Sequence, residues 1–191
     1  MSKVHHMRYT FDMTIADKIY KEVDDFGLIT SAEARKFGVT NAELVQQAHR
    51  GKLVHVARGV YRMPIWPFQE AAPYAIAVKA VGEGARLYGE SVIALLGLAP
   101  TNPSRMWVAA PGRVRRNIGE GVNVVRCDAN DPVTYFEGIP CQILINAITD
   151  AARTMGTMRA IEAAHEAEKQ GYLTYVEASA IERELGDDKE A

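Results

Sequence analysis

The sequence contains few of the residues that build metal centres, disulfide frameworks or membrane spans. It has two cysteines, Cys127 and Cys141, whose spacing matches no metal-ligand motif, so a reduced pair is expected. No apolar run approaches the ~20 residues that cross a bilayer. The polar segment from Met1 to Thr10 does not resemble a signal peptide. These absences predict a cytoplasmic protein with no membrane partner.

Catalytic motifs are missing as well. The glycines at 82 and 84 do not belong to the G-x-x-x-x-G-K-[ST] pattern of a phosphate-binding loop. Ser91 has no glycine two residues after it, which a nucleophile elbow requires. A metal-dependent nuclease of the D…E-x-K type would have an acid where Ala167 precedes Lys169, and Asp150 is interpreted as a helix residue satisfied locally. The sequence therefore predicts no catalytic residue, metal ligand or cofactor, and a protein that is not an enzyme.

Charge is low in total and uneven along the chain. The net charge of -2 and the pI of about 6.2 are not the general signature of a nucleic-acid binder. Between Thr40 and Arg62, however, Glu43 is the only acidic residue against four lysines and arginines. From Asp150 onward, acidic residues outnumber basic ones roughly two to one, which is typical of a solvated or protein-binding surface. The case for DNA binding must therefore rest on where the charges lie, and the segment 40–62 is the first basic cluster.

Two short helices joined by a tight turn are predicted in the first third of the chain. Thr30-Ser31-Ala32-Glu33 and Thr40-Asn41-Ala42-Glu43 are capping boxes that start helices. Gly38 and Gly51 suit the left-handed residue that ends a helix. The predicted helices are 31–37 and 41–50, preceded by an apolar periodicity that predicts a further helix over 14–26.

A basic hairpin follows these helices. The β-rich runs 52–57 and 60–63 are joined by Arg58-Gly59, a turn signal. Helix, tight turn, helix and hairpin together predict a winged helix-turn-helix. Two prolines in the segment 64–67 end regular structure, so we expect a DNA-binding domain over 1–66.

The helix 41–50 is the predicted recognition helix. Leu44 and Ala48 lie four residues apart and point to the core, which leaves a polar face for bases. Glutamine can bond adenine and arginine can bond guanine through two hydrogen bonds each. The DNA-binding residues predicted on this helix and its cap are Thr40, Asn41, Gln46, His49 and Arg50. Considered alone, Gln46 and Arg50 would equally suit a solvated helix surface.

The hairpin supplies the predicted phosphate contacts, which are Lys52, His55, Arg58 and Arg62. Arg58 stands at the turn, where it could reach a minor groove or a phosphate, or be a solvated turn residue.

The remaining residues, 67–191, predict a mixed α/β domain with a helical tail, so the fold class is α+β. The expected helices are 71–81 and 88–98, the expected strands are 106–110, 122–127, 133–136 and 139–142, and the expected tail helices are 144–155, 158–169 and 175–185. A second basic cluster contains Arg113, Arg115 and Arg116. It suits a DNA backbone, an RNA, an acidic partner or a solvated loop, and we include it among the candidate DNA contacts.

The first third of the chain resembles the N-terminal domain of AbiEi-type antitoxins, which belong to abortive-infection (type IV) toxin–antitoxin systems. The matching segments are Gly27-Leu28-Ile29-Thr30, Gly38-Val39-Thr40, Arg50-Gly51-Lys52-Leu53 and Val56-Ala57-Arg58-Gly59-Val60-Tyr61-Arg62. A weaker similarity to the C-terminal domain of that family covers Tyr88-Gly89-Glu90-Ser91 and Gly138-Ile139-Pro140.

The resemblance implies a winged-helix antitoxin that represses its own operon by binding promoter repeats. It also implies a nucleotidyltransferase-like toxin as partner, counteracted without necessarily forming a stable complex. Many relatives have an arginine-rich recognition helix, whereas this one carries Gln46, Gln47, His49 and only Arg50. The DNA sequence that it reads should therefore differ, and its affinity should depend more on the hairpin. The alternatives are a winged-helix protein-interaction module or a regulator that acts without a toxin, and a hydrolase or nuclease is the least favoured.

Overall fold

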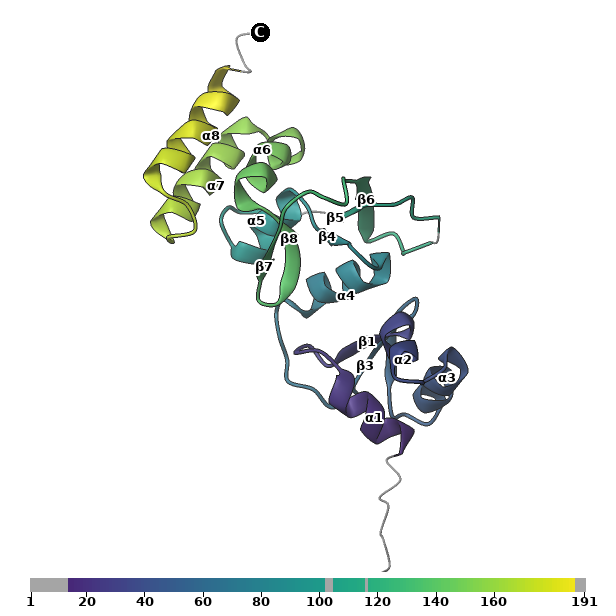
Figure 1. Cartoon of the computed structure of the whole chain (residues 1–191). Helices are drawn as coiled ribbons and strands as arrows, with labels where there is room; N and C mark the ends of the chain where they lie inside the picture. The colour runs from purple at the N-terminus through teal and green to yellow at the C-terminus, as the bar shows by residue number, and fades with distance from the viewer. Residues whose placement is uncertain (1–13, 102–104, 116, 188–191) are drawn as a thin grey trace, which may run out of the picture. The chain divides into compact units, whose positions relative to one another are not determined.

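The computed structural model describes residues 14–101, 105–115 and 117–187 (Figure 1). Over these residues it has eight α-helices and two sheets, which is the expected α+β class. The chain divides into two compact units, Met1–Trp66 and Pro67–Ala191, and each is described by itself.

The first unit alternates helices with short strands. Its elements in chain order are α1 (Ile15–Glu22), β1 (Leu28–Thr30), α2 (Ser31–Lys36), α3 (Asn41–His49), β2 (Val54–Ala57) and β3 (Val60–Arg62). Both predicted capping boxes are present, at the starts of α2 and α3, and they confirm these two helices. The predicted hairpin is also confirmed as β2 and β3, which pair antiparallel. Its first strand begins at Val54, two residues later than predicted, because the Lys52 N–H donates to the Gln47 carbonyl (2.9 Å) in the bend that follows α3.

The first helix is shorter than the sequence suggested. The prediction ran to residue 26, but α1 ends at Glu22 and Val23 is already extended. The Asp24 carboxylate accepts hydrogen bonds from the backbone N–H groups of Phe26 (2.9 Å) and Leu28 (2.8 Å). Aspartate bonds of this kind compete with helical hydrogen bonds and favour a turn. The turn allows Phe26 to be buried although it lies outside the helix.

The strand β1 was not expected, and it completes a sheet of order β1-β3-β2. It pairs antiparallel with β3, with Ile29 opposite Tyr61 and Thr30 opposite Val60. Because β3 lies in the middle, the hairpin is bound along one side to the segment that leads directly into α2.

The core of the first unit lies between the three helices and this sheet. Its buried members are Ile19, Ile29, Ala34, Val39, Leu44, Leu53 and Tyr61. Trp66, at the end of the unit, makes an edge-on contact with Tyr20 and donates a 3.0 Å hydrogen bond from Nε1 to the Asp25 carbonyl. The last residue of the unit is thus bound to the segment just after α1.

The second unit contains a five-stranded sheet of order β6-β5-β4-β8-β7. Its elements are α4 (Ala72–Val81), β4 (Arg86–Leu87), α5 (Glu90–Leu96), β5 (Met106–Ala110), β6 (Val122–Arg126), β7 (Val133–Phe136), β8 (Ile139–Gln142), α6 (Leu144–Met155), α7 (Thr157–Lys169) and α8 (Tyr175–Asp187). The β5–β6 and β4–β8 pairs are parallel, and the β4–β5 and β7–β8 pairs are antiparallel. The helix α4 packs against β4, β5 and β8.

Most elements of this unit match the expected ranges, with one correction. The helix predicted over 88–98 is the shorter α5, and the two-residue strand β4 precedes it. The central position of β4 explains why it forms, since Arg86 and Leu87 are both buried between neighbouring strands. The tail helices α6, α7 and α8 pack side by side (Figure 1). In the described ranges, no helix combines the length and the apolar character needed to cross a membrane.

Replacing Gly27 with alanine tests how the end of the first unit is held. Gly27 has φ +69°, and a methyl group there would overlap the Trp66 indole. A left-handed alanine costs about 1–2 kcal/mol, and overpacking adds about 1–3 kcal/mol. Gly38→Ala is the matched control, because Gly38 has φ +83° but open space around it. In a Trp107→Phe background, urea unfolding followed by Trp66 fluorescence should show the larger loss for Gly27→Ala. Equal losses for the two variants would contradict the role of the indole contact.

Candidate nucleic-acid interface

The helix α3 begins at a complete capping box. The Thr40 hydroxyl accepts from the Glu43 N–H (3.3 Å), and the Glu43 carboxylate accepts from the Thr40 N–H (2.7 Å) and hydroxyl (2.8 Å). These bonds hold the pKa of Glu43 below its ordinary value, the backbone bond from Thr40 being the largest cause. The capping contribution of this carboxylate is present above its unfolded pKa and is lost as pH falls through the lowered value.

The polar face predicted for this helix is exposed. Gln46, His49 and Arg50 are all exposed, while Leu44 is completely buried. Gln47 is 7% exposed and belongs to the inner side, so it is not available for base contacts. Asn41 is exposed too, and its Oδ1 accepts a hydrogen bond from the Ser31 hydroxyl (2.9 Å). Its amide N–H₂ group has no hydrogen bond to the described residues.

The hairpin distributes its cations unequally. Arg58 is exposed at the turn, next to Gly59 with φ +72°. Lys52 and His55 are also exposed. Arg62 differs, because it lies at the end of β3 remote from the turn, opposite Leu28 and Val54, and it is half-buried. Of the four hairpin residues predicted to contact DNA, Arg62 is thus the least accessible.

Ser31, which was not among the predicted site residues, links the hairpin turn to α2 and α3. Its backbone N–H donates to the Gly59 carbonyl (2.9 Å), and its hydroxyl lies 3.5 Å from the same oxygen. The hydroxyl also donates to Asn41 at the start of α3. Ser31, at the N-terminus of α2, therefore holds the turn that carries Arg58 in position relative to the start of α3.

Besides Lys18 and Lys21 of α1, two further cations of the described first unit were not among the predicted residues. Arg35 and Lys36 form the last turn of α2, and both are exposed. Cations at a helix C-terminus interact favourably with the helix dipole, so the sequence pattern alone does not mark these two residues as ligand contacts. The exposed cations of the described first unit therefore include residues at the end of α2, at the end of α3 and in the hairpin turn.

The second basic cluster lies in the second unit, after β5. Arg113 and Arg115 are exposed, and they line a hollow of about 370 Å³ together with Glu83. Arg116 lies outside the described residues. The cluster is accessible to a ligand.

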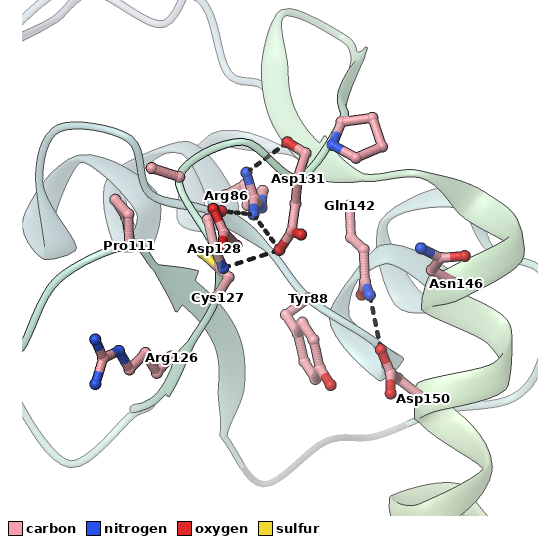
Figure 2. Close-up of a pocket in the computed structure, with 12 residues that line it drawn as sticks. Arg86, Tyr88, Pro111, Arg126, Cys127, Asp128, Asp131, Gln142, Asn146 and Asp150 are labelled. Carbon is pink, nitrogen blue, oxygen red and sulfur yellow. Dashed lines mark hydrogen bonds and ion pairs between the residues drawn. The ribbon is translucent and has the colours of Figure 1, made fainter.

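A larger pocket of about 750 Å³ occupies the second unit, and no sequence pattern predicted it (Figure 2). Arg86, which is 3% exposed, donates from Nη2 to the Asp128 carbonyl (2.9 Å) and to Asp131 Oδ2 (2.9 Å). Its Nη1 donates to the Asp131 carbonyl (3.2 Å). The buried guanidinium thereby holds the loop between β6 and β7.

On another side of this pocket, Gln142 of β8 donates from Nε2 to Asp150 Oδ2 (2.7 Å) (Figure 2). The Gln142 Oε1 accepts from the Gly89 N–H (3.1 Å). Burial raises the pKa of Tyr88 to about 12, with a smaller effect from its hydrogen bond to Asp150. Asp150 is thus satisfied by partners on β8 and just after β4, whereas the sequence suggested local satisfaction within its helix. Arg86 and Asp150 both bond to other residues of the protein, so their positions in the pocket wall are explained by the fold without a ligand.

The described residues contain neither a metal-binding cluster nor a disulfide bond. No group of three or more His, Cys, Asp or Glu side chains in the described part of the chain could hold a metal ion. Cys127 and Cys141 are free thiols, and burial raises the pKa of Cys141 to about 12. No family model matches the chain, and no curated protein is significantly similar to it.

The coupling between Ser31 and Asn41 can be measured by a double-mutant cycle. Ser31→Ala removes a donor that bridges α2, α3 and the turn, and it should lower the free energy of unfolding by about 1 kcal/mol. Asn41→Ala removes the acceptor and should have a smaller effect once Ser31 is already alanine. Urea unfolding of the two single variants and the double variant checks this result. Fully additive losses would contradict the proposed link between the helices.

Proposed function

We propose that residues 14–66 form a winged helix-turn-helix and that the protein is a DNA-binding antitoxin that represses its own operon. The observation that carries the DNA-binding part is the exposed polar face of α3, joined through Ser31 to a turn bearing Arg58. The element order α1-β1-α2-α3-β2-β3 and the pairing of β1 with β3 support the same architecture.

In this mechanism, α3 enters the major groove and its exposed side chains contact base edges. Gln46 can bond adenine and Arg50 can bond guanine, each through two hydrogen bonds. His49, between them in sequence, adds a further polar contact. The Thr40 hydroxyl is used in the capping box, so its part is to fix the start of α3. Asn41 keeps its amide donors for a phosphate or a base.

Affinity would come mainly from phosphate contacts. Lys52, just before β2, and Arg58, in the hairpin turn, are exposed, and Arg35 and Lys36 are exposed at the end of α2. Each neutralised phosphate releases counterions, so binding falls with salt. Arg113 and Arg115 of the second unit are candidates for additional backbone contacts. Arg62, half-buried in β3, contributes less than the other cations in this proposal.

The antitoxin part of the proposal rests on the resemblance of the first third of the chain to AbiEi-type antitoxins. It predicts binding to repeats at the promoter of the protein's own operon and a nucleotidyltransferase-like toxin as the protein that it counteracts. Expression of that toxin with and without this chain tests it. Growth rescue by the chain is the expected outcome, and continued toxicity would contradict the antitoxin role.

A protein-interaction module is the second candidate. Tyr172, Tyr175 and Val176 are exposed large side chains before and within α8, a helix whose surroundings are acidic. Exposed apolar groups of this kind suit a protein partner better than a polyanion. Binding to random duplex at about 50 mM salt separates the two candidates, because a pure protein-interaction module would not bind under that condition.

Arg58→Ala tests the phosphate contacts. Removing one phosphate contact should weaken binding to all duplexes alike and reduce the slope of log K against log salt by about 1. Fluorescence anisotropy over a salt series measures both quantities. Arg183→Ala, on the exposed surface of α8, is the matched control and should leave the slope unchanged. An unchanged slope for Arg58→Ala would remove the hairpin from the interface.

Gln46→Ala tests base recognition. The variant should bind non-specific duplex as well as the parent chain does, but it should lose about 1–3 kcal/mol of discrimination at one base pair. Competition between a selected duplex and its single-base-pair variants measures the discrimination position by position. A uniform loss over all positions would indicate a structural role for Gln46, and no loss at any position would take α3 out of the major groove.

A further inference from the structure

A groove of about 490 Å³ lies between α3 and the β2–β3 hairpin of the first unit. Val45 and His49 line it from α3, Val54 and His55 line it from β2, and the buried Tyr61 of β3 completes the lining. The ring of His55 lies 5.2 Å from that of Tyr61, centroid to centroid. The groove thus has an apolar and aromatic lining between the two elements proposed to contact DNA.

The two valines are unusually accessible. Val45 is 38% exposed and Val54 is 47% exposed. Among the described residues of the first unit, the large apolar side chains with comparable exposure are Tyr20, Val45, Val54 and Ile65. Two of these four, Val45 and Val54, line the same groove. Exposed apolar groups that share one groove mark an interaction site, whereas a single exposed group would need no explanation.

The surroundings of the groove favour a polyanion as the ligand of this site. Lys52, two residues before β2, and Arg58, in the turn between β2 and β3, are exposed. Glu43, the acidic residue of the segment 40–62, has its carboxylate engaged by the Thr40 N–H and hydroxyl. The major groove of duplex DNA combines the two required properties, because phosphates border it and thymine C5-methyl groups project into it.

The position of Val45 places it beside the base-reading residues. It precedes Gln46 directly, and it lies one helical turn before His49 on the side of α3 that lines the groove. Val54 faces the same groove from the strand opposite. A base edge that reaches His49 therefore has an apolar contact available from Val45, one turn away on the same side of the helix.

We propose that Val45 and Val54 recognise thymine methyl groups, so that the preferred duplex carries thymines at fixed positions next to the base pairs contacted by His49. This inference rests on the proposed DNA binding and adds a base preference to it. The valines select thymine over cytosine or uracil through an apolar contact, while Gln46 and Arg50 select purines through hydrogen bonds.

Replacing thymine with uracil tests the inference, because uracil keeps every hydrogen bond and removes only the methyl group. Duplexes are first recovered from a random pool by repeated selection with the full chain. Each thymine is then replaced singly by uracil, and binding is measured by fluorescence anisotropy. One or two replacements should weaken binding about fourfold, the effect of burying one methyl group. In Val45→Ala or Val54→Ala, the effect at the matching position should disappear. Val176→Ala, at a 75% exposed valine of α8, is the control and should keep it.

The outcomes separate this inference from the function on which it rests. Tight, salt-dependent binding with no uracil effect at any position would overturn the methyl contact and leave DNA binding intact. A uracil effect of equal size in the parent chain and in both valine variants would also overturn it, because the methyl would then be recognised elsewhere. If no duplex is selected or bound, the DNA-binding function fails and the thymine contact fails with it.

Discussion

The bond network of Ser31 is the constraint on which the proposed interface depends. Its N–H donates to the Gly59 carbonyl, and its hydroxyl donates to the Asn41 side chain. A two-residue turn by itself can take several orientations relative to a helix in the same domain. Here the turn is bound to the residue that starts α2, which in turn is bound to the residue that starts α3. The distance between the helix surface and Arg58 is thereby set within the domain, before any ligand is present.

This pre-set arrangement explains how a chain with a net charge of -2 could bind a polyanion. Lys18 and Lys21 lie on α1, and the other exposed cations of the described first unit lie at the end of α2, around the end of α3 and in the hairpin turn. In the segment 40–62, four lysines and arginines stand against the single carboxylate of Glu43. Local charge, more than total charge, decides the attraction within a Debye length of about 10 Å. The apolar groove between α3 and β2 then offers a short-range contact that salt does not screen.

Local signals in the sequence predicted the helices well and the sheets in part. The capping boxes at Thr30 and Thr40 specify α2 and α3 because all their hydrogen bonds lie within four residues. The strands β1 and β4 were missed because they have only three and two residues and acquire their pairing from distant strands. The first helix was predicted too long, since the turn made by the Asp24 side chain competes with an apolar periodicity that continues to Phe26.

The candidate site was predictable to a similar degree. The exposed positions of Gln46, His49, Arg50 and Arg58 followed from helical spacing and from the turn signal. The role of Ser31, the inward position of Gln47 and the partial burial of Arg62 did not, because each depends on contacts between separate elements. The pocket around Arg86 also has no sequence signature, since its walls come from strands and loops far apart in the chain.

The most direct test of the account is a map of amide chemical shifts in the full chain on addition of duplex DNA from upstream of its own operon. The account predicts that the largest changes fall on residues 40–50, which comprise α3 and its two caps, and on the turn at 57–60, with little change in α1. Changes confined to other segments, or no change at about 50 mM salt, would contradict the claim that α3 and the turn together form a DNA-binding surface.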